Sequence, residues 1–460
     1  MQQIEYLILG SGLSGLSASY HLGHERCLIL EANDHPFGHV SSEIFNGFTW
    51  DIGPHVSFTK SQYIKDIFSE SVNEKYYEKE VSVGNYFNGF WIDHPVQANL
   101  YQVPEPLRSS CVDSFMEIKD KDNSDNVRNY KEWLTNSLGK KITENFVTPY
   151  TEKYWTTGPE NLTTDWIGSR MFRPNRNDIL NGSIRKPDKS KHYINKIRYP
   201  VSGGYQSYAR IFAKTVNILT NHRVVGIDCS KKIVTCKNGE QFSYKKLINS
   251  IPLPEFVKMI NGISGDALKA SEELVCSSLL LVNVEAPCKT TRPESWIYMY
   301  DKDKYSTRIN FIEKMSDNNA PHGTSGIQVE VYFSKYRKKE KTDGQIAELV
   351  IRELIEMGLI SKEDVKKGDV QFHTKWAPYA NVIFDHNRKK ALKVIFDELD
   401  KSGLIRREDE LEAVTNWDKK EKETSGSLAL VGRFGEWKYY WSDDALLSGK
   451  RASEEFNIDI

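Results

Sequence analysis

The sequence predicts an α/β protein that combines a discontinuous Rossmann-like domain, a helical insert and an antiparallel sheet. A glycine-rich turn, GSGLSG at residues 10–15, stands between an apolar strand and a helix near the start of the chain. Short apolar strands return at residues 199–252 and 428–460, so we expect later segments to complete the first domain. Residues 276–335 alternate apolar and polar side chains, which is typical of an antiparallel sheet.

The amino-terminal unit has the spacing of a dinucleotide-binding βαβ motif. Residues 4–9 form the apolar strand, Gly10 permits the tight turn, and Gly12 lets a pyrophosphate approach the backbone. Gly15 lets the helix lie close to the sheet, and Glu31 ends the second strand, where a carboxylate can accept hydrogen bonds from a ribose. We therefore expect a dinucleotide at this edge of the sheet.

The helix that follows the turn begins at Leu13 and Ser14. Its first N–H groups have no partner inside the helix, and the helix dipole adds partial positive charge at the same end. Both features favour a phosphate group there.

The middle of the chain predicts a helical insert. Residues 104–193 are polar and show helical patterns at 129–138, 141–146 and 164–171. The last part, 173–192, is rich in Asn, Gly, Pro and Lys. We expect it to be a loop, either mobile or simply solvated.

The antiparallel part contains two local signals. Residues 86–91 predict a hairpin, because Asn88 and Gly89 form a strong type I′ turn sequence. Residues 345–357 predict a helix, with Asp343 as its amino-terminal cap. The expected domain boundaries are 1–75, 196–262 and 426–460 for the dinucleotide-binding domain, 101–195 for the helical insert, and 76–100 with 263–425 for the antiparallel-sheet substrate domain.

The composition argues against several classes of protein. A net charge of −1 and a pI near 6.8 give no bulk attraction for nucleic acid or an anionic membrane. No apolar run approaches the length that spans a bilayer. The 6 cysteines form no C-x-x-C pair and have no nearby histidine at ligand spacing, so we expect reduced thiols, no metal and a cytoplasmic location.

Four further segments carry a family resemblance. They are DIGPHVSF at 51–58, HPVQANL at 94–100, YPVSGG at 199–204 and GRFGEWKY at 432–439, and WIGSR at 166–170 agrees with them. Together they resemble the UDP-galactopyranose mutases, particularly the longer eukaryotic-type enzymes. The GxGxxG turn is shared with FAD-dependent amine oxidases and protoporphyrinogen oxidases, whereas the GPH and GRFGxWKY segments are more specific to the mutases.

The resemblance implies a flavoenzyme that requires reduced FAD and catalyses no net redox change. In that family, flavin N5 attacks the anomeric carbon of a nucleotide sugar, and the sugar recloses through a different hydroxyl, which converts a pyranose into a furanose. A nucleotide-binding domain split along the chain is also typical of flavoproteins. The residues expected to hold the FAD are Gly10, Gly12, Leu13, Ser14, Gly15, Glu31, Gly38, Gly53, Val225, Gly432, Asp444 and Ala445.

Four residues match family positions at the reacting centre. A diphosphate leaving group requires bidentate cationic donors, and Arg170 and Arg308 match the two diphosphate arginines of the family. Arg170 is expected on an apolar helix, and Arg308 in an alternating strand. Arg433 matches an arginine beside the flavin. His55 matches a histidine that responds to the flavin redox state, with a purely structural role as the alternative.

The other substrate positions come from the same comparison. Tyr379 and Tyr439 match phosphate-binding tyrosines, with packing as the alternative role. The full expected substrate-binding set is His94, Gln97, Thr151, Trp155, Trp166, Arg170, Arg308, Tyr379 and Tyr439.

Several positions depart from the family pattern. The usual Gly-Gly after the ribose-binding acid is here Gly38-His39. The base-flanking aromatic corresponds to His94, the asparagine of the base pocket to Thr151, and a further phosphate-binding tyrosine to Met315. Such changes could switch the nucleotide or be neutral drift.

Three functions remain open at this point. The leading one is a mutase that acts on UDP-galactose or on a related sugar linked to UDP, dTDP or GDP. The alternatives are an FAD-dependent oxidoreductase acting on an amine, porphyrinogen or carotenoid, and a flavin-binding scaffold without turnover. The sequence contains no second GxGxxG, so NAD(P)H, if it is the reductant, would enter the substrate site. A homo-oligomer is also expected.

Overall fold

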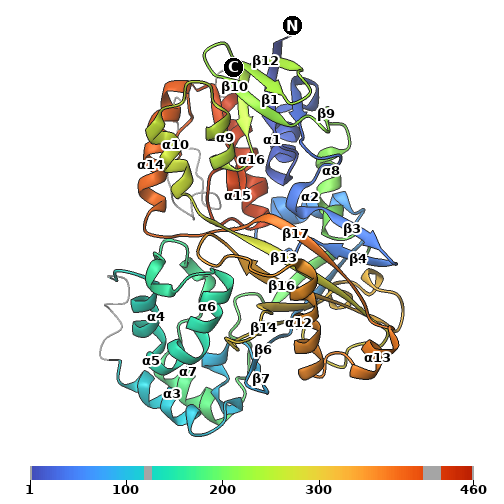
Figure 1. Cartoon of the computed structure of the whole chain (residues 1–460), viewed down its shortest axis with the longest axis vertical. Coiled ribbons are helices and arrows are strands. Elements are labelled where there is room, and N and C mark those ends of the chain that lie inside the picture. The colour runs from blue at the N-terminus through green and yellow to red at the C-terminus, as the bar shows by residue number, and fades with distance from the viewer. Residues whose placement is uncertain (1–2, 119–126, 408–425, 458–460) are drawn as a thin grey trace.

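The first sheet gathers strands from three distant stretches of the chain (Figure 1). The computed structural model describes residues 3–118, 127–407 and 426–457. Within these residues the seven strands of the first sheet are β1 (Gln3–Leu9), β2 (Cys27–Leu30), β9 (Ile218–Leu219), β10 (Val224–Asp228), β11 (Ile233–Cys236), β12 (Gln241–Asn249) and β18 (Leu428–Leu430).

The core of this sheet is parallel. β1 runs parallel to β12 on one side and to β2 on the other, and β9 and β18 extend the parallel pairing outward. β10 and β11 are attached to β12 as an antiparallel meander. The predicted α/β class, with a discontinuous parallel sheet, is confirmed.

Helix α1 (Leu13–Leu22) and helix α16 (Ser442–Asn457) pack against each other beside this sheet (Figure 1). Small side chains make the contact close. A Cβ at Gly449 would lie 2.1 Å from the carbonyl oxygen of Ser14 and 2.9 Å from the amide nitrogen of Ala18. The last helix of the chain therefore packs directly on the turn of α1 that follows the glycine motif.

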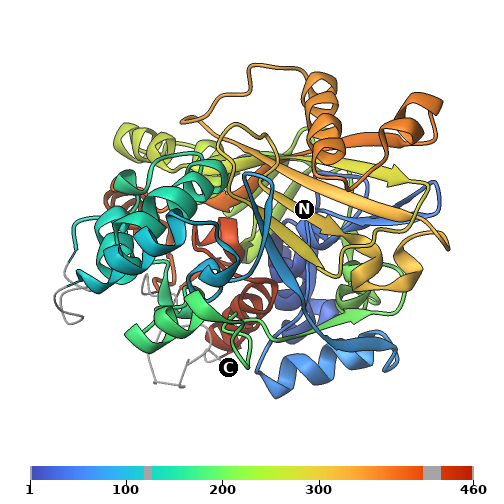
Figure 2. The ribbon, with the colours of Figure 1, turned by 90° about the horizontal axis from the view of Figure 1, so that it is seen from below.

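The second sheet carries the predicted antiparallel pattern. Within the described residues its seven strands are β6 (Val83–Phe87), β7 (Phe90–Asp93), β13 (Cys276–Ala286), β14 (Trp296–Met299), β15 (Arg308–Phe311), β16 (Ser325–Phe333) and β17 (Gln371–Val382). All neighbouring strands are antiparallel except β6 and β14. Asn88 and Gly89 both have positive φ, as the predicted type I′ hairpin requires. Figure 2 shows β6 and β7 between the insert and the rest of this sheet.

Helices α12 (Asp343–Glu356) and α13 (Lys362–Lys367) follow β16 in the chain. The predicted cap of α12 was wrong by one residue. Thr342 is the amino-terminal cap, and its side chain and that of Gln345 form a reciprocal capping box. Asp343 is instead the first helical residue, where its negative charge favours the helix dipole.

The insert is helical, as predicted, but two of its segments differ from expectation. Residues 173–192 contain helix α7, because Asn175 and Asp178 form a capping box that starts it. Residues 164–171 form only the 3₁₀ turn Gly168–Arg170, since Gly168 has a φ of 47° that interrupts any longer helix. The helices of the insert are α3 (Leu107–Met116), α4 (Tyr130–Leu138), α5 (Lys140–Ile142), α6 (Thr148–Tyr154) and α7 (Arg176–Ile184), with a π-helical turn, Thr143–Val147, between α5 and α6.

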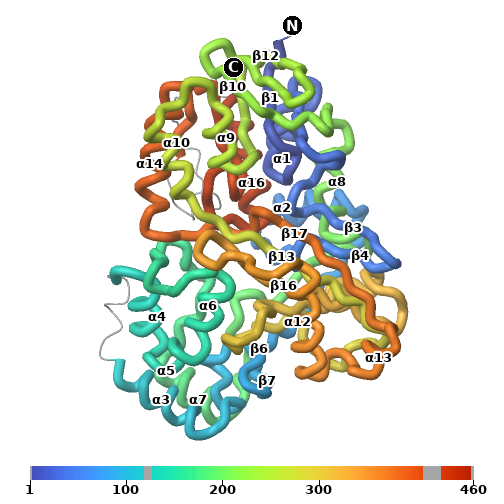
Figure 3. Tube along the Cα trace, in the orientation of Figure 1, coloured from blue at the N-terminus to red at the C-terminus, as the bar shows by residue number. Residues whose placement is uncertain are grey.

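Shorter elements connect these parts, and Figure 3 allows the path of the chain between them to be followed. Two pairs of strands form small antiparallel sheets, β3 with β4 and β5 with β8. The remaining elements are β3 (Ser42–Phe45), β4 (Phe48–Asp51), α2 (Gln62–Ser71), β5 (Tyr76–Glu80), β8 (Lys196–Pro200), α8 (Arg210–Ala213), α9 (Leu253–Met259), α10 (Gly265–Glu273), α11 (Ile312–Met315), α14 (Arg388–Leu399) and α15 (Gly432–Gly435).

The cysteines and the helices can be compared with two further expectations, reduced thiols and the lack of a segment that spans a bilayer. Cys27, Cys111, Cys229, Cys236, Cys276 and Cys288 are all free thiols. Among the helices of the described residues, none has both the length and the apolar character needed to cross a membrane.

Candidate active site

A cavity of about 920 Å³ opens between the first sheet, the second sheet and the insert. It brings together most of the predicted site residues, although they come from distant parts of the chain. Those in its wall are Gly10, Gly12, Leu13, Ser14, Glu31, Gly38, Gly53, His55, His94, Gln97, Thr151, Trp155, Trp166, Arg170, Arg308, Tyr379, Arg433, Tyr439 and Ala445. Gly15, Val225, Gly432 and Asp444 lie outside the wall.

The glycine-rich turn has the geometry that the motif predicts. Gly10 has a φ of 90°, and a Cβ at Gly15 would lie 2.2 Å from the Gly10 carbonyl oxygen, so a side chain at Gly15 would push α1 off the turn. Beside Gly12 the space is open, with no atom within 4 Å of the Cβ position. No side chain caps α1, so its first N–H groups are available to an anion in that space.

Glu31 lies directly beside this turn. Its carboxylate accepts hydrogen bonds from the Ser11 amide at 2.9 Å, the Ser11 hydroxyl at 2.6 Å and the Asn33 amide at 2.9 Å. These bonds hold a buried carboxylate at the end of β2, where a dinucleotide ribose would lie.

Like Gly10, three more of the predicted cofactor glycines adopt backbone conformations that favour glycine. Gly38, Gly53 and Gly432 all have positive φ. A Cβ at Gly432 would lie 2.3 Å from the Ser14 hydroxyl, and one at Gly38 would lie 3.1 Å from the Cα of Gly12. Gly432 therefore packs against the start of α1 outside the cavity wall, whereas Gly38 lies in the wall.

Two predicted cofactor positions lie elsewhere. About half of the Val225 side chain is exposed, and Val224 lines the cavity instead, because successive residues of a strand face opposite sides. Asp444 accepts a hydrogen bond from the Trp441 amide at 2.9 Å, at the start of α16. Burial, together with the neighbouring Asp443, raises the pKa of Asp444 to about 7.

Two histidines and an arginine face one another near the glycine turns. Burial and the Arg433 guanidinium lower the pKa of His39 to about 4 and that of His55 to about 3, so both rings are neutral at pH 7. The His55 Nδ1 lies 3.1 Å from the Gly53 carbonyl, to which it can only donate. The His39 ring packs on Phe434 in a nearly perpendicular arrangement, with ring centroids 5.3 Å apart.

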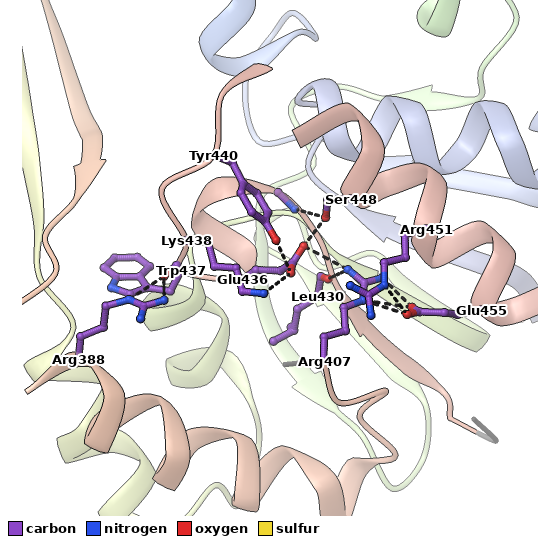
Figure 4. Close-up of polar contacts among 11 residues, drawn as sticks. Arg388, Arg407, Leu430, Glu436, Trp437, Lys438, Tyr440, Ser448, Arg451 and Glu455 are labelled. Atoms are coloured by element: carbon purple, nitrogen blue, oxygen red, sulfur yellow. Dashed lines mark hydrogen bonds and ion pairs between the residues drawn. The ribbon is translucent and has the colours of Figure 1, made fainter. Parts of the chain in front are cut away.

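The segment after α15 is irregular, and arginine side chains satisfy its carbonyl groups. Arg388 donates to the Trp437 carbonyl, Arg170 to the Tyr439 carbonyl and Arg433 to the Tyr440 carbonyl. The bonds from Arg388 are drawn in Figure 4. Guanidinium groups thus fix a loop that forms no regular structure.

A buried ionic network holds the other side of the same loop (Figure 4). Glu436 accepts hydrogen bonds from the Ser448 hydroxyl, the Tyr440 hydroxyl and Arg407. The Ser448 hydroxyl accepts in turn from the Gly432 amide at 2.9 Å. Through Ser448, the network ties the Gly432 turn to α16.

Arg170 reaches the cavity without a carboxylate partner. Its guanidinium donates to the carbonyls of Trp166 and Tyr439, both at 3.1 Å, and it lies over the Trp441 ring at 4.3 Å. Its Nε is buried and has no hydrogen-bond partner in the described residues. Among the described residues, Arg433 likewise donates only to neutral oxygens, those of Tyr440, Ala380 and Asn381.

Arg308 has a partner that the sequence reasoning missed. Its Nε and Nη2 donate to the two oxygens of Glu330 at 2.7 and 2.8 Å, across the β15–β16 pair. Burial alone would lower the pKa of Arg308, but the Glu330 carboxylate raises it well above its usual value. The Tyr332 hydroxyl also donates to Glu330, at 3.0 Å.

The predicted phosphate-binding tyrosines behave differently from each other. The Tyr439 hydroxyl lies 2.8 Å from the Tyr154 hydroxyl, and its ring packs beside Arg170. The Tyr379 hydroxyl donates to Glu255 of α9 at 2.8 Å and is therefore engaged away from Arg308. Met315, the position of a further phosphate-binding tyrosine in the family pattern, is buried in a core cluster and does not line the cavity.

Most of the remaining predicted residues belong to the insert, whereas Gln97 precedes it. Trp155 packs on Trp166 at 4.8 Å and on Tyr439 at 5.1 Å. Gln97 donates to the Phe172 carbonyl at 3.0 Å, and Thr151 is buried on α6. All of these side chains line the cavity.

Several wall residues were missed by the sequence reasoning. Glu330 had a visible signal, since it is an acid within a strand, IQVEVYF, whose other residues are mostly apolar. Tyr193, Trp441 and Phe58 form an aromatic cluster whose members are separated in the sequence, so no local pattern indicates it. Among the described residues there is no group of three or more side chains suited to hold a metal ion.

A parallel sheet with a glycine-rich turn, joined to an antiparallel sheet across one cavity, is the arrangement of an FAD-binding protein. Residues 13–456 match the flavin containing amine oxidoreductase family, and the chain belongs to that family. It is similar in fold to a reduced UDP-galactopyranose mutase, with a TM-score of 0.85, 22% identity and coverage of 100% of this chain and 95% of that one. It also resembles a putative protoporphyrinogen oxidase from Exiguobacterium sp. 255-15 (TM-score 0.72, 15% identity, full coverage of both chains). A third likeness is to putrescine oxidase (TM-score 0.63, 12% identity, 99% coverage of each chain).

The residues present fit the FAD that the family implies. The helix end beside Gly12 is uncapped and faces open space, which suits a pyrophosphate. Glu31 is held at the ribose position, and Gly38 and Gly53 leave the wall clear of side-chain atoms. His55 and Arg433 would then lie at the flavin end of the site.

Proposed function

We propose that this protein is a nucleotide-sugar pyranose–furanose mutase, with UDP-galactose as the first substrate to test. The observation that carries the proposal is the pair of guanidinium groups of Arg170 and Arg433, which line the cavity and form no ion pair within the described residues. Guanidinium groups that line a cavity and have no carboxylate at ion-pair distance favour an anionic ligand, although the Asp443 and Asp444 carboxyl groups lie close enough to interact with Arg170.

Arg308 supports the same ligand in another way. Two of its N–H groups are taken by Glu330, and its Nη1 makes no hydrogen bond to any described residue. The carboxylate fixes the orientation of that free nitrogen. Together with Arg170 and the tyrosine pair of Tyr154 and Tyr439, it offers several fixed donors to a diphosphate.

The chain holds the leaving group, and the cofactor supplies the reaction chemistry. When bound and reduced, FAD supplies a nucleophile for the anomeric carbon. The arginines would retain the nucleoside diphosphate close to that carbon until it is returned. His55, neutral at pH 7, would contact the flavin without adding charge.

Reduction of the purified holoenzyme followed by addition of UDP-galactofuranose tests the proposal directly. We expect UDP-galactopyranose to form only with the reduced enzyme, and the assay extends to dTDP- and GDP-linked sugars. If reduced enzyme isomerises none of them while an amine causes oxygen consumption, the protein is an oxidase of the same family. NAD(P)H is proposed as the reductant, and the six free cysteines favour the proposed cytoplasmic location.

A substitution at Arg170 distinguishes the effect of its positive charge from that of its planar set of donors. Arg170→Lys keeps the positive charge but loses the planar set of donors, so we expect UDP to bind about tenfold more weakly. Arg176→Lys, on the exposed surface of α7, is the matched control and should leave binding unchanged.

A further inference from the structure

Two histidines, His94 and His192, lie next to each other in the cavity wall. Their rings are nearly perpendicular, with centroids 4.9 Å apart. His94 follows β7, whereas His192 lies in the segment that leads into β8. Two parts of the chain that are far apart in sequence thus meet at one point of the wall.

The tautomer of His192 is set by its main-chain partner. Its Nδ1 lies 2.9 Å from the Ile194 carbonyl oxygen, which can only accept, so Nδ1 carries the hydrogen. The Nε2 is then a lone-pair acceptor. That atom is buried, the residue is only 5% exposed, and Nε2 has no hydrogen-bond partner in the described part of the chain.

Asn85 sets the tautomer of His94, and it also places the hydrogen on Nδ1. The Asn85 amide nitrogen donates to the carbonyls of Ile92 and Asp93, both at 3.2 Å, which directs its Oδ1 toward the histidine. Oδ1 accepts from the His94 Nδ1 at 2.9 Å. The His94 Nε2 is therefore also an acceptor, and no described residue donates to it.

Both rings remain neutral near pH 7. Burial lowers the pKa of His192 to about 4, and burial together with the neighbouring His192 lowers that of His94 well below its usual value. To make Nε2 a donor, either ring would have to gain a charge in a buried place or give up the hydrogen bond that its Nδ1 donates. Two neighbouring residues of the cavity wall therefore each contain a ring acceptor to which no described residue donates.

We infer that the His94–His192 pair binds a ligand group that carries two hydrogen-bond donors, either a vicinal diol of the sugar or an exocyclic amino group of the base. An unmatched buried acceptor is costly, whereas a donor from the ligand would satisfy it. The diketo edge of uracil or thymine offers one donor between two carbonyl oxygens, so it would leave one histidine facing another acceptor. This inference rests on the proposed nucleotide-sugar function, because that function places a base and a sugar in the cavity.

The neighbours of the pair place it beside the diphosphate position. His94 packs on Tyr298, which pairs with Arg308 across β14 and β15. On the other side, Tyr193 follows His192 and stacks on Trp441, over which Arg170 lies. The pair is thus flanked by both proposed diphosphate arginines, where a sugar or a nucleoside can reach it.

A pair of substitutions at residue 192 isolates the acceptor. His192→Asn places an amide where Nδ1 lies, so it can still donate to the Ile194 carbonyl, but it removes the acceptor at Nε2. His192→Gln places its amide oxygen near the Nε2 position and restores an acceptor. His322→Phe, an exposed histidine outside the cavity wall, is the control for loss of a ring nitrogen.

Titration calorimetry of the holoenzyme with defined ligands distinguishes the sources of the donors. If a sugar diol is the partner, His192→Asn should weaken the binding of UDP-galactose about tenfold and leave the binding of UDP unchanged. The binding of a deoxygalactose analogue should not respond to the substitution. With a base amine as the partner, wild type prefers CDP, GDP or ADP to UDP, and His192→Asn removes the preference. In both cases His192→Gln restores binding.

The contrary results are equally defined. If His192→Asn binds every ligand as tightly as wild type, the acceptor pair has no role in recognition and the inference is wrong. If no nucleoside diphosphate binds to wild type at all, the proposed function fails instead. Flavin content and the absorbance spectrum confirm that each variant is folded. If His192→Asn does not fold, the affinities of the wild-type protein are sufficient for the test. Equal affinity for UDP and CDP, together with equal affinity for UDP-galactose and its deoxy analogues, would overturn the inference.

Discussion

At the scale of single residues, Arg308 depends on one carboxylate. Glu330 binds it through two parallel hydrogen bonds and is itself 1% exposed. Removing one member of a buried pair leaves a charge without compensation, and that loss costs more than the pair contributes. The stability of the second sheet should therefore be sensitive to either residue.

Glu330→Gln is expected to lower the free energy of unfolding by about 2 kcal/mol, which is less than the roughly 3–5 kcal/mol typical of fully buried pairs because Arg308 reaches the cavity. Urea denaturation of the holoenzyme measures it. The double variant Arg308→Met, Glu330→Met should be more stable than either single variant, since apolar side chains of similar volume can replace a buried ion pair. A double variant less stable than both would contradict this account.

The residue scale also shows what a sequence can reveal. The glycine turn and Glu31 were identified from local spacing, and the structure places them together as expected. The Glu330 partner of Arg308 was not identified, because the two residues are paired only by the register of β15 and β16. The family resemblance matched Tyr379 to a phosphate-binding tyrosine. Its hydroxyl donates instead to Glu255 of α9, an element that no local pattern relates to β17.

At the scale of elements, the Gly432 turn depends on helix α16. The Gly432 amide donates to Ser448, whose hydroxyl donates to Glu436. If Ser448 loses its hydroxyl, the amide loses its acceptor and the turn loses its tie to the helix.

Ser448→Ala is expected to weaken FAD binding by about threefold to tenfold, because a buried N–H group is left without a partner. The rate and equilibrium of flavin release, followed by fluorescence, measure the effect. Ser453→Ala, which removes only a bond to Lys450 within the same helix, is the matched control. Equal flavin release from both variants would mean that the turn holds its shape unaided.

The packing of α16 on α1 makes a second prediction at this scale. A Cβ at Gly449 would meet the backbone of α1, so Gly449→Ala should destabilise the protein by about 2 kcal/mol. Gly344→Ala in α12 meets no atom within 4 Å and should stabilise by about 0.5 kcal/mol, since alanine is the better helix former. Thermal unfolding of the two variants compares them directly.

At the scale of the whole molecule, buried histidines link stability to pH. Burial lowers the pKa of His192 to about 4, below the usual value of 6.5 for an unfolded chain. Between these values the unfolded chain binds a proton that the folded chain does not, so the free energy of unfolding falls as the pH falls. His39 and His55 act in the same direction, whereas Asp444, with its raised pKa, acts against them.

His192→Asn should reduce the dependence of stability on pH. The variant loses one titrating group, so the slope of unfolding free energy against pH should decrease by up to about 1.4 kcal/mol per pH unit between pH 4 and 6.5. Urea titrations at several pH values in this window measure the slope for wild type and variant. Parallel slopes would show that His192 is protonated equally in both states.

The fold class followed from the sequence because each of its elements has a local signal. Periodicity located β1, β12 and β16, and turn residues located the β6–β7 hairpin. Helix α7 was missed because its apolar residues are few, and it is started by a capping box rather than marked by periodicity. The cavity wall could be predicted only in part, since the aromatic cluster at Trp441 exists only once distant segments have met.

The late return of the chain to its first sheet has a consequence for biosynthesis. β18 pairs with β12, and α16 packs on α1, yet both belong to the last stretch of the polypeptide. A nascent chain emerging from the ribosome can build the insert and the second sheet while the nucleotide half still lacks one strand and one covering helix. The site that would bind flavin is therefore incomplete until residues 428–457 have been made. In a cell short of flavin, newly made chains would accumulate with both sheets already formed, not at an early stage of assembly.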